Sequence, residues 1–129
     1  MNRSWTPPIA ALPMLLASAV PLLAQTTPPV KVIEVTASRF EFQPERIEVN
    51  EGDHVRLILH SADTKHGFVI PELGVNAATV PKGGAPVTVE FVAGKVGTFA
   101  FKCSEYCGSG HKRMTGAIVV VAKTQARAQ

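Results

Sequence analysis

The 129-residue sequence predicts an all-β fold, a two-sheet β-sandwich of Greek-key type with about 7–8 strands. Between residues 30 and 123, short apolar runs are separated by Gly and Pro, and no segment keeps a long helical periodicity. Apolar and other residues alternate along several segments, as expected for strands that turn one face to a core. At 13.7 kDa, the chain has room for a single domain.

The predicted strands follow one another between residues 30 and 121. The clearest alternation is that of Val55, Leu57 and Leu59, which share one face of a strand. Turns rich in Gly, Asn and Asp precede this strand and a later one. The predicted strands are Val30 to Val35, Phe40 to Phe42, Ile47 to Val49, Val55 to His60, Val87 to Phe91, Phe99 to Cys103 and Ala117 to Val121.

The N-terminal residues 1–24 have the order of an export signal. Arg3 is the only charge before Lys31, and Ile9 to Leu23 is an almost uninterrupted apolar stretch that ends in small residues. This stretch is shorter than the ~20 apolar residues that span a bilayer. We therefore expect a signal peptide over 1–24, a linker over 25–29, the domain over 30–123 and a polar tail over 124–129. The mature chain should lie in the periplasm or otherwise outside the cytoplasm, without a transmembrane segment.

The charge pattern argues against nucleic acid as a partner. Thirteen Lys and Arg residues against ten Asp and Glu residues give a net charge of +3, and the basic residues are scattered singly. The single Trp, Trp5, lies in the predicted leader, so the mature domain offers no Trp for base stacking.

The segment CSEYCGSGHKRM concentrates the residues that carry chemistry. It holds both cysteines of the chain, Cys103 and Cys107, together with His111 and Met114, in a Gly-rich loop between two predicted strands. Two thiolates, an imidazole and a thioether form a soft ligand set, which suits copper far better than calcium, magnesium or manganese. His66, in the segment SADTKHGF, is the candidate for a further ligand.

Other interpretations of these residues compete with copper. A disulfide between Cys103 and Cys107 accounts for neither His111 nor Met114, and closing so short a loop adds little stability. Zinc has little use for a thioether, and the close CxxC pair of most structural zinc sites is absent. Copper is therefore favoured over both.

The ligand count is compatible with either one or two copper ions. Cys107, His111, Met114 and His66 already make a mononuclear blue-copper set, which leaves Cys103 as surplus. If both thiolates bridge, the same residues fit a dinuclear site. Met114 is then the weak ligand of one ion, and a main-chain carbonyl between the cysteines, most simply that of Glu105, serves the other.

In these residues the sequence resembles the dinuclear CuA cupredoxin domains of cytochrome c oxidase subunit II and of nitrous-oxide reductase. The matching features are the motif CxExCxxxHxxM and the upstream segment HGFVIPELGV, with Asp63 three residues before its His. The similarity extends from about Arg39 to Val121. It implies a cupredoxin Greek-key sandwich that binds two copper ions. The implied metal-site residues are His66, Cys103, Glu105, Cys107, His111 and Met114: the two cysteines bridge, each histidine binds one ion, Glu105 binds through its backbone carbonyl and Met114 is the weak ligand.

The resemblance also implies a function: one-electron transfer by an exported soluble domain that is not an enzyme by itself but can be a component of a cytochrome c oxidase-type complex. The expected partner is a redox protein, such as a c-type cytochrome or a terminal oxidase. The chain departs from the family pattern at Arg39 to Phe42, which stands where the family has an aromatic-rich strand containing Trp. The alternatives are a copper storage or delivery protein and a mononuclear blue-copper electron carrier.

Overall fold

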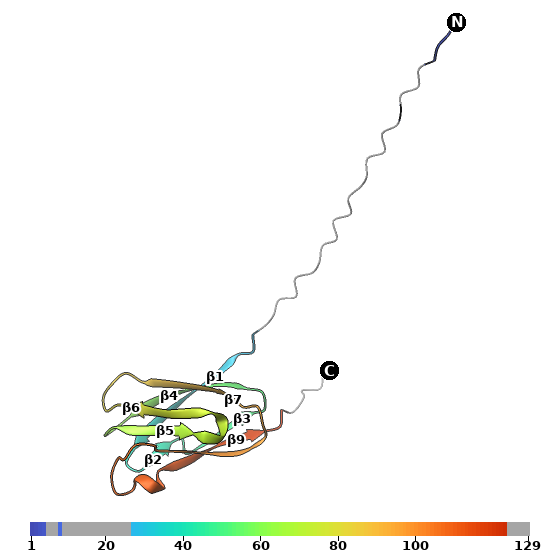
Figure 1. The fold of residues 1–129 in the computed structure, drawn as a ribbon. Helices are drawn as coiled ribbons and strands as arrows, with labels where there is room; N and C mark the ends of the chain where they lie inside the picture. The colour runs from blue at the N-terminus through green and yellow to red at the C-terminus, as the bar shows by residue number, and fades with distance from the viewer. Residues whose placement is uncertain (5–7, 9–26, 124–129) are drawn as a thin grey trace.

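The protein forms two β-sheets that face each other across a hydrophobic core (Figure 1). The computed structural model describes residues 1–4, 8 and 27–123. One sheet has the strand order β2–β1–β4–β7 and the other β3–β9–β8–β5–β6. The strands are β1 (Val30–Ser38), β2 (Glu41–Gln43), β3 (Arg46–Asn50), β4 (His54–Ser61), β5 (His66–Ile70), β6 (Val75–Val80), β7 (Val87–Val92), β8 (Gly97–Lys102) and β9 (Thr115–Val121).

The predicted all-β sandwich is confirmed, and every strand predicted from the sequence is present. Two further strands, β5 and β6, were not predicted individually. Two single-turn 3₁₀ helices, η1 (Pro71–Leu73) and η2 (His111–Arg113), complete the regular structure. Most of the predicted leader over 1–24 and all of the tail over 124–129 lie outside the described residues. Among the residues described, no helix is long and apolar enough to cross a membrane.

The strand order reflects a chain that passes repeatedly between the two sheets. β1 pairs in parallel with β4, and β3 pairs in parallel with β9, whereas the other neighbours are antiparallel. Because β2 and β3 belong to different sheets, the crossing between them brings distant parts of the sequence side by side, as in Greek-key sandwiches.

The core is built from the inward faces of the strands. Val55, Leu57 and Leu59 of β4 are all buried, as their alternation predicts. The rings of Phe42, Phe68 and Phe101 pack against one another with centroids 5.1–5.6 Å apart. Phe68 and Phe101 are each two residues away in sequence from a predicted metal ligand, His66 and Cys103. Two of the three contacts are edge-on, the arrangement that aromatic quadrupoles prefer. This ring cluster packs the core next to the predicted ligands.

Candidate metal centre

One end of the sandwich gathers the predicted ligands from three parts of the chain. β5 begins with His66, and β8 ends one residue before Cys103. Val69 of β5 pairs with Lys102 of β8, so the start of β5 lies beside the cysteine loop. η2 begins with His111 at the same end, away from the places where β1 begins and β9 ends (Figure 1).

The ligand atoms lie close to one another. The Sγ atoms of Cys103 and Cys107 are 3.7 Å apart, far beyond the ~2.05 Å of a disulfide, and both cysteines are free. His66 Nδ1 lies 4.0 Å from the sulfur of Cys103, and His111 Nδ1 lies 3.8 Å from that of Cys107. Met114 Sδ is 3.8 Å from Cys107 Sγ. The structure therefore brings together the five side chains that the sequence predicts as ligands.

The candidate ligand side chains are buried, except that of His111. His66 and Met114 are fully buried and each cysteine is 5 % exposed, whereas His111 is half-buried. Burial raises the pKa of the Cys107 thiol to about 11, and the neighbouring Cys103 contributes in the same direction. A metal ion that binds here must displace the thiol proton, and its positive charge then compensates the thiolate in this apolar setting.

Asp63 holds the ring of His66. Its Oδ1 lies 2.7 Å from His66 Nε2, while its Oδ2 accepts a hydrogen bond from the backbone N of Arg39, also at 2.7 Å. Burial alone would raise the pKa of Asp63, but hydrogen bonds from Arg39, His66 and Thr64 outweigh it and lower the pKa. An ionised carboxylate at Nε2 leaves Nδ1 free to bind a metal beside the Cys103 sulfur, the usual arrangement of metal-binding histidines.

Arg39 contacts both Asp63, which holds His66, and the loop that carries Cys107. The sequence did not predict this role. Besides its backbone contact with Asp63, its Nε donates a hydrogen bond to the carbonyl of Cys107 at 2.9 Å. One residue thus reaches both the support of His66 and the loop that carries the second cysteine. The only sequence signal was its place beside an aromatic strand, far from the ligand motif.

A glycine in β5 allows the backbone to approach the cysteine loop. A Cβ atom on Gly67 would lie 2.2 Å from Ser104 Oγ and 2.5 Å from the backbone N of Glu105, closer than real Cβ contacts. The Gly67 N–H also points at the sulfur of Cys103, at 3.4 Å. Any side chain at this position would push the loop away from its place beside His66.

The carbonyl of Glu105, and not its carboxylate, lies beside the sulfur of Cys103. The Glu105 carbonyl oxygen lies 3.0 Å from Cys103 Sγ. The carboxylate instead accepts a hydrogen bond from Thr79 and pairs with Lys65 Nζ at 3.1 Å. These two partners, Thr79 first, lower the pKa of Glu105. The predicted use of a backbone carbonyl is therefore compatible with the geometry.

Tyr106, which stands between the two cysteines in the sequence, lies at the protein surface. Its side chain is 77 % exposed, and its ring lies beside that of His111 with centroids 5.8 Å apart.

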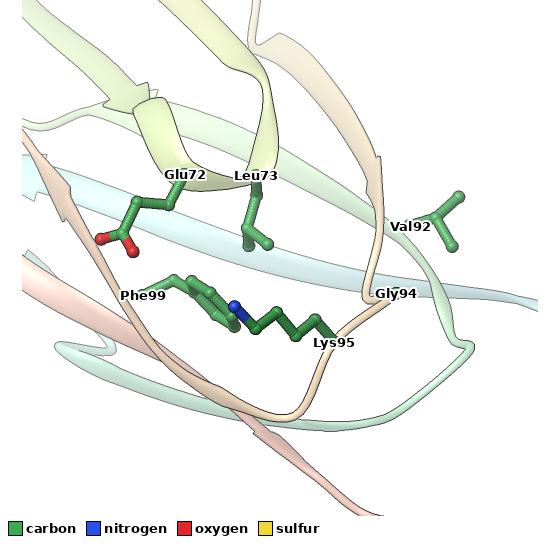
Figure 2. Close-up of a pocket in the computed structure, with 6 residues that line it drawn as sticks. All are labelled: Glu72, Leu73, Val92, Gly94, Lys95 and Phe99. Atoms are coloured by element: carbon green, nitrogen blue, oxygen red, sulfur yellow. The ribbon is translucent and has the colours of Figure 1, made fainter.

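An open hollow of about 470 Å³ lies away from the predicted ligands, between η1 and the loop from β7 to β8 (Figure 2). None of the predicted ligands lines this hollow.

The donor set fits copper. A metal ion about 2.3 Å from a thiolate can touch two sulfurs that are 3.7 Å apart at the same time. Each imidazole nitrogen lies near a different sulfur, and a thioether completes the set. Sulfur and imidazole donors of this kind select soft or borderline ions, and the thioether favours copper because zinc sites use Cys, His and carboxylate ligands.

A two-sheet sandwich with Cys, His and Met ligands at one end defines a class of copper-binding electron-transfer domains. The chain matches the family model for cytochrome c oxidase subunit II, periplasmic domain, over residues 20–123. It belongs to this family, and this membership indicates a copper-binding domain outside the cytoplasm.

Individual relatives agree with this family. The chain is 35% identical over 98 residues to cytochrome c oxidase subunit 2 of Thermus thermophilus, which covers 76% of this chain and 71% of that protein. It is 34% identical to nitrous-oxide reductase of Cupriavidus necator over 70% of this chain but only 14% of that protein. The crystal structure of the periplasmic domain of subunit II from Bradyrhizobium japonicum shares the fold, with a TM-score of 0.66 at 23% identity. That match covers 76% of this chain and 89% of the other. The expected cupredoxin-like fold is thereby confirmed.

Proposed function

We propose that the chain is a CuA-type domain that holds two copper ions between the sulfurs of Cys103 and Cys107 and transfers one electron at a time. The observation that carries this proposal is the pairing of each sulfur with its own imidazole. His66 Nδ1 lies 4.0 Å from one sulfur, and His111 Nδ1 lies 3.8 Å from the other. A mononuclear site needs only one thiolate and would leave the second sulfur without a role.

The protein's part in this function is to hold the ligands still. A copper pair that shares one electron changes its bonds little on reduction, which makes electron transfer fast. Asp63 fixes the ring of His66, and the Gly67 N–H points at the sulfur of Cys103. The ring cluster of Phe42, Phe68 and Phe101 lies below, in the strands that carry the ligands. These contacts limit the movement of the ligand atoms and so support a small reorganisation energy.

The biological setting is part of the same proposal. We infer that residues 1–24 are an export signal and that residues 30–123 act as the electron-transfer domain, with 25–29 as linker and 124–129 as tail. The domain is not an enzyme by itself and serves a terminal oxidase or a c-type cytochrome as its redox partner. The relatives named subunit 2 of cytochrome c oxidase support this role.

The substitution Cys103→Ser separates the dinuclear site from a mononuclear blue-copper site. Cys107 keeps its contacts with His111 Nδ1 and Met114 Sδ, both at 3.8 Å, so the variant should bind one copper ion and turn blue. The wild-type protein should bind two. Metal analysis and visible spectra of the copper-loaded proteins measure both. A variant that still binds two copper ions would exclude bridging by Cys103.

Glu105→Gln is the matched control for the cysteine loop. The Glu105 carboxylate is directed to Thr79 and Lys65, so the change should leave the copper spectrum as it is. Loss of the spectrum would mean that the carboxylate itself binds metal. Rapid loss of copper from the wild-type protein to a weak chelator would instead indicate a storage or delivery protein.

A further inference from the structure

The centre reaches the protein surface at His111. Among the side-chain ligands, His66 and Met114 are fully buried and the cysteines nearly so, whereas His111 is half-buried. Electron transfer between proteins falls off steeply with distance, so a partner gains most by docking where a ligand is nearest the surface. Three exposed residues surround this ligand in the loop and in η2: Tyr106, Lys112 and Arg113. We call these four residues the His111 surface.

The His111 surface carries two cations that form no ion pair within the described part of the chain. Lys112 and Arg113 are exposed, and neither takes part in an ion pair there. The acidic groups closest to the ligands are already engaged. Asp63 accepts hydrogen bonds from His66 and from the Arg39 backbone. Glu105 pairs with Lys65.

Two acidic residues of the segment from Glu41 to Asp53, Glu48 and Glu51, are directed away from this surface. Glu48 lies 3.9 Å from Arg46, and the backbone N of Glu51 bonds to Val121 O, where β9 ends. That is the end of the sandwich opposite η2 (Figure 1). Glu45 lies nearer, since its carbonyl accepts a hydrogen bond from Ala117 N at the start of β9, but it forms no ion pair with either cation of η2.

We propose that the His111 surface is the docking site for a redox protein whose own cofactor edge is lined by acidic side chains. The proposal rests on the electron-transfer function proposed above and names the charge of the partner. Complementary charge steers a partner and fixes its orientation. The exposed Tyr106 ring supplies a contact of the kind enriched at protein interfaces. Docking there places the partner's cofactor beside His111.

The test compares two forms of one electron donor. Mitochondrial cytochrome c is basic, and succinylation of its lysines makes the same protein acidic. In either form, ferrous haem gives one electron to the oxidised copper centre and becomes ferric, and no bond or proton changes place. Stopped-flow rates with the copper-loaded protein are measured at about 10 mM ionic strength, where the Debye length is about 30 Å, and then with added salt.

The acidic donor should react at least about tenfold faster than the basic donor at low ionic strength, and salt should slow it. The double substitution Lys112→Gln and Arg113→Gln should lower its rate at least about threefold and leave the copper content and spectrum unchanged. The matched control is Lys95→Gln. Lys95 lies beside the hollow at the far end of β8 (Figure 2), so its loss should not change the rate. A faster basic donor, or equal effects of the double substitution and the control, would overturn the proposal.

A second readout separates docking from electron transfer. Amide chemical shifts of the reduced, copper-loaded protein report binding of ferrous succinylated cytochrome c without any reaction, because neither protein can then accept an electron. Shifts centred on Tyr106, His111, Lys112 and Arg113 would support the docking site even if the centre proved to hold a single copper ion. Shifts on another face, or none, would contradict the docking site even if metal analysis gave two ions per chain.

Discussion

Replacing Gly67 by Ala tests the close packing that positions the centre. A Cβ at this position would lie 2.5 Å from the backbone N of Glu105 and 2.8 Å from that of Ser104. Ordinary contacts begin at 3.4 Å, so the closest backbone atom of the cysteine loop, the Glu105 N, must retreat by about 0.9 Å. Overpacking of this kind costs about 1–3 kcal/mol. For a domain of this size, that lowers Tm by about 5–20 °C.

The matched control is Gly94→Ala. Nothing lies within 4 Å of a Cβ at Gly94, so the same substitution meets no obstacle there. Reduced chain entropy in the unfolded state should make this variant as stable as the wild type or more stable by about 0.4–1 kcal/mol. Urea unfolding of the two variants, with equal slopes in denaturant, gives the difference in their free energies of unfolding.

The copper spectrum supplies the second half of this test. Because the retreating loop carries Cys103 and the Glu105 carbonyl, the spectrum of copper-loaded Gly67→Ala should change, whereas that of Gly94→Ala should not. Adding Ser104→Ala removes only the hydroxyl contact, so the backbone clash and the loss of stability should remain. Equal stability and equal spectra for Gly67→Ala and Gly94→Ala would refute the close contact between β5 and the cysteine loop.

Three other substitutions test the hydrogen bond to His66, the weak ligand Met114 and the aromatic cluster next to the centre. Asp63→Asn should lower copper affinity about 10–100-fold in competition with a chelator, because an amide cannot accept hydrogen bonds at both of its ends; unchanged affinity would contradict the role of Asp63. Met114→Leu should keep the copper and shift the reduction potential measured by voltammetry; complete loss of copper would show that Met114 anchors the metal. Phe101→Ala should cost about 3–5 kcal/mol in urea unfolding, since its ring is fully buried, and a loss below about 1 kcal/mol would argue against the ring cluster.

The strands that the sequence predicts are those with one face in water. In β4, buried Val55, Leu57 and Leu59 alternate with residues that keep contact with solvent, so the period of two is visible. β5 was not predicted as a strand because four of its five residues are buried and its sequence shows no alternation. β6 has exposed small and polar residues in its middle and few strand-forming side chains.

The ligands could be predicted from the sequence because their chemistry is unusual. The residues that position them could not. Two cysteines, a histidine and a methionine at short spacing need a common explanation, and the structure gathers them with His66. Asp63 could equally have been a surface residue until its contact with His66 was seen. Arg39 lies far from the motif in sequence, and only the fold brings its side chain to the Cys107 carbonyl. Such contacts depend on the tertiary structure and leave no local pattern.

The measurement that tests the dinuclear centre most directly is electron spin resonance of the copper-loaded wild-type protein, together with its copper content. The arrangement of Cys103 and Cys107, each with its own imidazole, predicts two copper ions per chain and hyperfine splitting from an electron shared between both nuclei. One copper ion per chain, with splitting from a single nucleus, would contradict the dinuclear centre and identify a blue-copper site with Cys103 unused.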